Sequence, residues 1–265
     1  MPYGAQGNFY GTVEQFYSLL SPPDSLWPSS GRIRSSSIAV PVQTVGTTTN
    51  KVVDVSGIAH GTYSLVLRCA SDGQLNRSAV ATNPGQLPTF RISTDAGTTF
   101  SRPFRVSPDD DTAYIRDEET GLQLGLLWQF SGSGTFTAGD TWTTAAAPSP
   151  DVITHLEQAA SQLEGALSDS LKIPLTTCPA AAIFVQGALA LWTLIRKCGL
   201  DDQQDYKIYH PQETRDQLTG TSPARLLDRW RQGEDIKIFD GGDEGATRFP
   251  KWVQPTPFMK PYLPI

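Results

Sequence analysis

The sequence predicts an α+β fold in which a small bundle of about four helices carries a β domain of roughly 110 residues, inserted after the first helix. Three observations lead to this fold class. Apolar residues recur at three- and four-residue steps near both ends of the chain, as on one face of an α-helix. Between them lies a stretch rich in Thr, Ser, Val and Gly with alternating apolar and polar residues, which is typical of strands. Pro and Gly residues separate the segments.

The first predicted helix covers residues 9–20, FYGTVEQFYSLL. Thr12, followed three residues later by Gln15, forms a capping-box pattern, in which each side chain accepts a hydrogen bond from the other's backbone N–H. Ser21-Pro22-Pro23 ends this helix, because proline has no N–H and disfavours helical backbone in the residue before it. We assign residues 1–30 to an N-terminal helical segment of the bundle.

Residues 31–148 are predicted to form the β domain, a sandwich or a small barrel. Runs such as 63–68 and 125–130 alternate apolar and polar residues between turn-forming residues. The following segment, Ala145 to Pro150, is rich in Ala and Pro and is expected to act as a hinge into the next helix. An insertion of this size adds little strain where its two ends lie together.

Residues 149–238 are predicted to hold three more helices of the bundle. The first is capped by Ser149 or Asp151 and ends at Ile173-Pro174-Leu175. Eight of its apolar residues share one face: Val152, Leu156, Ala159, Ala160, Leu163, Ala166, Leu167 and Leu171.

The second of these helices is predicted from Pro179 to Lys197, with Gly199 supplying the left-handed residue after its end. The third runs from Ser222-Pro223 to Gly233. Ala224, Leu227 and Trp230 are expected to face inward. The three arginines of this helix, Arg225, Arg229 and Arg231, are expected to face outward, where they meet solvent, an acidic partner or phosphates.

Residues 239–265 are predicted to form an extended tail. This segment is rich in Gly, Pro and aromatic residues and has little means of burying itself. Large apolar side chains left in water are unusual in soluble chains, and stiff Pro-rich peptides dock well into grooves. We therefore expect the tail to bind a partner through five side chains: Phe249, Trp252, Phe258, Met259 and Tyr262.

Composition narrows the class of protein. The net charge of -6 argues against a main role in gripping nucleic acid, which needs a concentrated basic face. We find no window that approaches the roughly 18 apolar residues of a membrane span, and no N-terminal secretion signal. Cys69, Cys178 and Cys198 are widely spaced, so free buried thiols are expected.

No catalytic, cofactor-binding or metal-binding set is predicted, and we expect a non-enzymatic protein. His60, His155 and His210 are scattered and suggest neither a metal site nor a catalytic triad. Residues 93–100, STDAGTTF, resemble the Asp-box of sialidase-type propellers. A propeller needs several copies of such a unit, so this single copy indicates a structural turn in which Asp95 bonds nearby backbone N–H groups.

The order of the helical segments resembles a known family. A short N-terminal helix opening Tyr10-Gly11-Thr12, a helix ending LSDSLKIPL, a helix opening at Pro179 and a last helix ending RQGEDIKI are similar to the head-tail connectors of tailed bacteriophages. These are head completion or adaptor proteins of the phage Mu and lambdoid type. The resemblance covers about 100 residues. The members of this connector family are nearly all helical, so the β domain of this chain is a departure from the family.

This resemblance implies a structural virion protein located in the neck, at the head-tail junction, and assembled in the host cytoplasm. It implies a homo-oligomeric ring, with about twelve subunits, beneath the portal protein and against a tail, stopper or terminator protein. DNA would pass through the ring without sequence-specific binding, and no membrane is involved.

Two alternatives from other classes remain open. One is a carbohydrate-binding or decoration module acting through the β domain, with Trp128, Trp142 and Tyr114 as sugar platforms. The other is an enzyme, most plausibly a glycosidase, which would need two carboxylates facing one cleft. The sequence offers no means of pairing such carboxylates.

Overall fold

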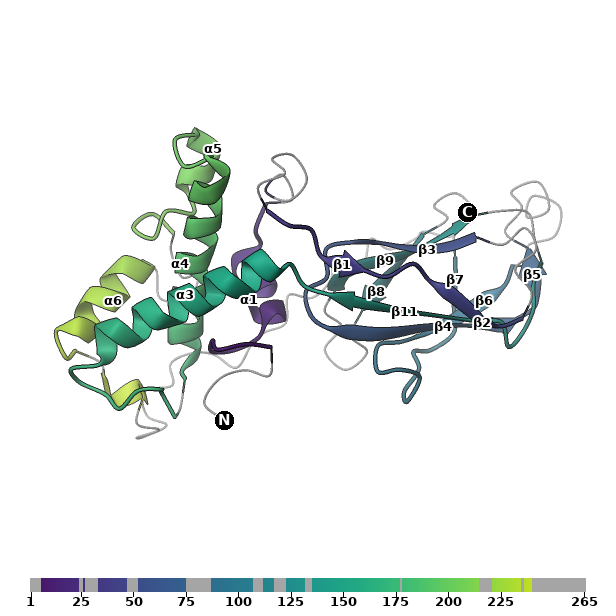
Figure 1. Ribbon diagram of the computed structural model, residues 1–265, viewed down its shortest axis with the longest axis horizontal. Coiled ribbons are helices and arrows are strands. Elements are labelled where there is room, and N and C mark those ends of the chain that lie inside the picture. Colours follow the sequence, from purple (N-terminus) through teal and green to yellow (C-terminus); the bar gives the residue numbers. More distant parts are fainter. Residues whose placement is uncertain are drawn as a thin grey trace, which may run out of the picture.

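The computed structural model describes residues 6–23, 26, 33–46, 52–74, 87–106, 112–116, 123–131, 135–176, 178–214, 221–234 and 236–239. The chain mixes helix and sheet, so the predicted α+β class is confirmed at that level. The helices gather at one end of the molecule and the strands at the other (Figure 1). We refer to these two ends as the helical part and the strand part.

The helical part is formed by segments from both sides of the strand part. Its helices are α1 (Val13–Leu20), α3 (Pro150–Leu167), α4 (Ala180–Cys198), α5 (Gln204–Lys207) and α6 (Pro223–Arg231), followed by the 3-10 helix η3 (Ile236–Phe239). One hydrophobic core joins α1, α3, α4 and α6, and it extends from Phe9 to Ile33 and from Val152 to Phe239. The core therefore includes Phe239, which the sequence had assigned to the tail.

The predicted helix ends are mostly in place. Thr12 and Gln15 form the capping box of α1, Ser149 caps α3 and Ser222 caps α6. Gly199 ends α4 in the left-handed conformation, at φ 67°.

The end of α3 differs from the prediction. It lies at Leu167, before the Ile173-Pro174-Leu175 segment. Ser168, Asp169 and Ser170 follow as a turn, because Ser and Asp side chains compete for backbone hydrogen bonds and weaken a helix interior.

The strand part contains three antiparallel sheets among the described residues. The largest has the order β1 (Ser37–Ile38), β11 (Thr141–Ala147), β4 (Tyr63–Ser71), β6 (Thr89–Ser93) and β7 (Phe104–Arg105), with β2 (Val42–Val45) also paired to β11. A second has the order β3 (Val52–Gly57), β9 (Gln123–Ser131), β8 (Thr112–Arg116). The third pairs β10 (Thr135–Phe136) with β5 (Gly73–Gln74).

All three sheets contribute to a second hydrophobic core. Leu67 and Phe90 come from the large sheet, Trp128 and Phe130 from β9, and Phe136 from β10. The Phe90 ring lies 4.8 Å from the Phe130 ring and 5.3 Å from the Phe136 ring, measured between centroids. Aromatic pairs at such distances add to the stability that burial provides.

The two ends of the strand part lie side by side. Ser37 and Ile38 of β1 are register partners of Ala147 and Ala146 of β11. Just outside this pairing, the Ser149 hydroxyl donates a hydrogen bond of 2.6 Å to the Arg34 carbonyl. The chain therefore leaves the helical part and returns to it at one place, as a low-strain connection requires.

Asp151, in the first turn of α3, organises this junction. Its carboxylate accepts hydrogen bonds from the Arg34 backbone N–H at 2.7 Å and from the Arg34 guanidinium at 2.9 Å. The Lys197 ammonium, from the last turn of α4, lies 3.1 Å away. The Asp151 side chain is only 6% exposed. One buried carboxylate thus connects the segment that leads into β1 with the start of α3 and the end of α4.

The charge of Asp151 is stabilised in the folded chain. Burial raises the pKa of the carboxyl group, but the hydrogen bonds from Arg34 and Lys197 outweigh it and lower the pKa to about 2. The start of α3 also favours a negative charge through the helix dipole. Asp151 is therefore ionised wherever the protein is folded near neutral pH.

A second set of contacts ties α1 to the strand part. The Tyr63 hydroxyl at the start of β4 donates to Glu14 of α1 at 2.8 Å. The His60 ring stacks on Tyr17 of α1 with 4.0 Å between centroids. Together with the Asp151 contacts, these hold the strand part to the helical part from two directions.

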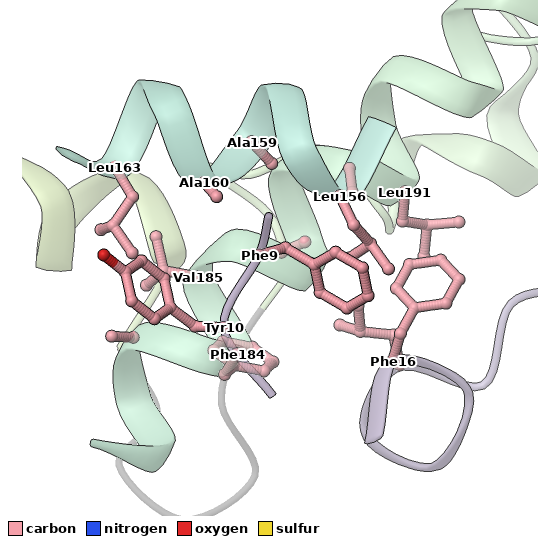
Figure 2. Packing of buried hydrophobic residues seen from close by; sticks show 14 of the residues in the cluster. Phe9, Tyr10, Phe16, Leu156, Ala159, Ala160, Leu163, Phe184, Val185 and Leu191 are labelled. Atoms are coloured by element: carbon pink, nitrogen blue, oxygen red, sulfur yellow. The ribbon is translucent and has the colours of Figure 1, made fainter. Parts of the chain in front are cut away.

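The segment before α1 is buried beneath α3 and α4. Figure 2 shows Phe9 and Tyr10 lying under Leu156, Ala160 and Leu163 of α3. The buried Gln186 amide of α4 accepts from the Tyr10 N–H at 3.1 Å and donates to the Tyr10 carbonyl at 3.2 Å. This pairing satisfies backbone groups that burial would otherwise leave at a cost.

Helix α4 overturns the expectation that no segment approaches a membrane span. Among the described residues, it alone has the length and composition to cross a bilayer, with a mean hydropathy of 1.3. However, 67% of that window is buried inside the structure, against α1, α3 and α6. A core helix surrounded by others is apolar on most sides for this reason.

We expect Asp151→Asn to lower the free energy of unfolding by about 2 kcal/mol at neutral pH, since a buried charge-assisted hydrogen-bond set is lost. Because the folded-state pKa lies below the ordinary 3.8, this contribution is present above that value and fades as the pH falls towards 2. Urea unfolding at several pH values measures the difference. Asp169→Asn, an exposed site, is the control. Equal stability of wild type and Asp151→Asn at pH 7 would contradict this role.

Candidate functional site

The outer face of α6 is the candidate site that the sequence predicted. Leu226, Leu227 and Trp230 are buried in the helical core. Arg225, Arg229 and Arg231 are exposed, as expected from their spacing. Ala224 is only half-buried, and the inward residue next to Leu227 is Leu226.

Acidic neighbours partly neutralise this face. The Arg229 guanidinium donates to Glu234 at 3.0 Å, and Arg231 lies 3.4 Å from Asp228. Both pairs are exposed, so each contributes little to stability. The α6 face therefore mixes both signs of charge, which suits a partner that carries its own pattern of charges better than it suits a uniform polyanion.

The tail starts beside α6. Phe239, the last described residue, is buried, and its ring packs edge-on against Trp230 at 5.2 Å between centroids. The tail side chains predicted to dock, Phe249, Trp252, Phe258, Met259 and Tyr262, lie outside the described residues. The structure therefore places the origin of the tail against the buried side of α6, which is opposite to the arginines.

Residues 93–100 form the structural turn that their sequence predicts. Asp95 accepts hydrogen bonds from the Ser93 hydroxyl at 2.6 Å and the Thr99 backbone N–H at 2.9 Å. The Ser93 and Thr99 hydrogen bonds lower the pKa of Asp95 to about 2. Gly97, at φ 89°, supplies the conformation that completes the turn.

Two of the three proposed sugar platforms are core residues. Trp128 and Trp142 are buried between the sheets, and neither side chain is accessible to a ligand. Tyr114 is exposed. The platform role of the two tryptophans is wrong, because both side chains pack in the core between the sheets.

The titratable side chains are not gathered into a reactive set. His60 stacks on Tyr17, His210 lies beside Trp192 and His155 lies on α3. No cluster of three or more His, Cys, Asp or Glu side chains that could hold a metal is found within the described ranges.

The three cysteines form no disulfide bond, as expected. Cys69 and Cys198 are buried and Cys178 is half-buried. Burial raises the pKa of the Cys178 thiol to about 12, which makes it a poor nucleophile.

Sequence reasoning missed a basic face on the strand part. Arg68 of β4, Arg91 of β6 and Arg105 of β7 project from the outer side of the large sheet, as their exposure and register indicate. Each stands alone in the sequence, so no charge cluster was visible. The alternating pattern within each strand was the available indication, but only the strand order brings the three together.

Comparisons with known proteins assign no family. No protein-family model matches this chain, and no curated protein or solved structure matches it.

We predict that a chain ending at Phe239 is as stable as the full chain, whereas Phe239→Ala loses about 3 kcal/mol because a buried aromatic side chain is removed from the helical core. Chemical unfolding of the three proteins measures this. A large loss of stability in the truncated chain would show that residues 240–265 belong to the helical core, and would contradict our placement of the tail.

Proposed function

We propose that this chain is a structural subunit of an oligomeric ring in the neck of a tailed bacteriophage. The ring joins the portal to the next tail component and extends the DNA channel. The observation that carries the proposal is the arrangement of the helical part, in which α1 packs in one core with α3, α4 and α6 although the strand part separates them in sequence. This order agrees with the resemblance to head-tail connectors.

In this proposal the strand part is a sandwich-type domain inserted into a connector-type helical bundle. The adjacent ends of the strand part, at Arg34 and Ser149, support an insertion. The helices provide the surface that meets neighbouring copies, and the strand part adds a further surface for another virion protein. About twelve subunits would match the portal. The many weak contacts of a ring make a durable joint.

The tail and α6 are proposed to form the portal-binding side. The tail starts at Phe239, which packs against the buried Trp230, and so it begins beside the helix that carries the arginines. Stiff, aromatic-rich peptides bind with a small loss of entropy. The net charge of -6 supports a channel through which DNA slides without adhesion.

Purified virions test the location of the protein. We expect antibodies against this chain, visualised by electron microscopy with gold labels, to mark the head-tail junction. Label over the capsid surface would favour the decoration alternative instead. Complete absence of the chain from virions would contradict the proposal.

Portal binding tests the predicted surface. We expect deletion of residues 240–265 to weaken binding to the portal at least tenfold, because the docking side chains are lost. A combined Arg225→Glu and Arg231→Glu variant should weaken it to a smaller extent, because exposed charges contribute less than buried aromatic residues. Arg116→Glu, an exposed arginine on β8, is the control. Unchanged affinity after deletion of the tail would reject this docking role.

A further inference from the structure

The outer face of the large sheet has a row of arginines on neighbouring strands. Arg68 of β4 and Arg91 of β6 are direct register partners. Arg105 of β7 is paired with Thr89, two residues from Arg91 on the same face. In antiparallel sheets the Cβ atoms of directly opposed residues lie about 5 Å apart, and diagonal neighbours on the same face lie about 7 to 8 Å apart. Like charges in these positions repel, so this arrangement is unfavourable for the isolated chain.

Nothing in the described part of the chain neutralises these arginines. None of the three forms an ion pair with a described residue. Asp95, in the adjacent turn, is already hydrogen bonded to Ser93 and Thr99. Arg68 is instead held over the Phe100 ring, 4.5 Å from its centroid, which fixes the guanidinium against the sheet. Arg68 thus presents an ordered positive charge on this face.

The same face has an exposed apolar edge. Val45 is the register partner of Thr141, which is itself the partner of Arg68, so these side chains lie in one row across the sheet. Val42 is paired with Thr143 on the same side. Val42 and Val45 are 60% and 55% exposed, and they are two of the five large hydrophobic residues exposed in the described structure. The face therefore fits a partner that is both acidic and apolar.

A surface with these properties occurs at the tip of the helical part that is formed by the end of α4 and by α5. The turn after α4 and helix α5 carry Asp201, Asp202 and Asp205, and Asp202 and Asp205 are exposed. Ile208, directly after α5, is 62% exposed. Lys207 is the basic residue within this stretch. Acidic groups beside an exposed apolar side chain complement the arginines and valines of the sheet.

One copy of the chain cannot bring these two surfaces together. Figure 1 shows α5 at the tip of the helical part, far from β2, β6 and β7 of the strand part. Contact between them requires two molecules. Because the two surfaces differ and lie far apart on one copy, they allow a head-to-tail contact, and its repetition gives a ring where the rotation closes.

We propose that the outer face of the large sheet binds the α5 tip of a neighbouring copy of this chain. Arg68, Arg91 and Arg105 meet Asp202 and Asp205, and the valine edge covers Ile208. This inference rests on the proposed function in one respect, which is that identical copies of the chain assemble into a ring. It assigns the basic face to the joint between subunits and so keeps these arginines off DNA in the channel.

Sedimentation velocity of the full chain at about 0.05 M salt tests the contact, because exposed charges act strongly at low ionic strength. We expect Arg91→Glu to weaken self-association about tenfold and the Asp202→Lys, Asp205→Lys double variant to do the same. Arg116→Glu, an exposed strand arginine on the second sheet, should leave association unchanged. Raising the salt to about 0.5 M should weaken the wild type in the same way.

Mixing the two variants separates a lost contact from misfolding. The Arg91→Glu chain retains an intact α5 tip and the double variant retains an intact sheet face, so the mixture should associate although neither variant does alone. Recovery of association in the mixture supports the contact. A mixture that stays monomeric, a monomeric wild type, or an Arg91→Glu chain that associates like the wild type would overturn it.

The outcomes also distinguish this inference from the proposed function. Rings that persist in Arg91→Glu would remove the inference and leave a neck ring built on other surfaces. Open chains of wild-type molecules, disrupted by Arg91→Glu and replaced by one-to-one pairs in the mixture, would keep the inference and contradict a closed neck ring.

Discussion

The buried Asp151 carboxylate is the interaction on which the arrangement of this protein depends. Asp151 lies in the first turn of α3. Its carboxylate binds Arg34, in the segment that leads into the strands, and Lys197, in the last turn of α4. A buried carboxylate is costly unless it is paired and hydrogen bonded, so the contacts with Arg34 and Lys197 offset the cost of burying Asp151. The contacts of Glu14 and Tyr17 with Tyr63 and His60 then fix the strand part against α1.

Much of the helical part was predictable because local chemistry determines it. Thr12 and Gln15 predict the start of α1, and Gly199 predicts the end of α4, from short-range hydrogen bonds and backbone preferences. The end of α3 was placed too late, since the apolar repeat continues to Leu171 while Ser168 to Ser170 already favour a turn. Leu171 continues the apolar repeat because its side chain packs against the helical core. Such packing does not require the residue to be in a helix.

The strand part was predictable only as a class. Alternation identifies strands, but strand order and register depend on contacts between distant residues, which no local pattern contains. Trp128 and Trp142 were assigned to a ligand surface for this reason, and the same limitation hid the meeting of Arg68, Arg91 and Arg105. The α6 arginines could be predicted because they share one helix. The sheet face became visible only with the pairing of β4, β6 and β7.

We propose that the surfaces of this chain serve assembly, with the outer face of the large sheet complementary to the α5 tip of another copy. Electron microscopy of the purified full-length protein tests this claim most directly. We predict closed rings with a central hole, in which the strand part of one copy touches the helical part of the next. Monomers at every concentration, or compact dimers without a hole, would contradict it.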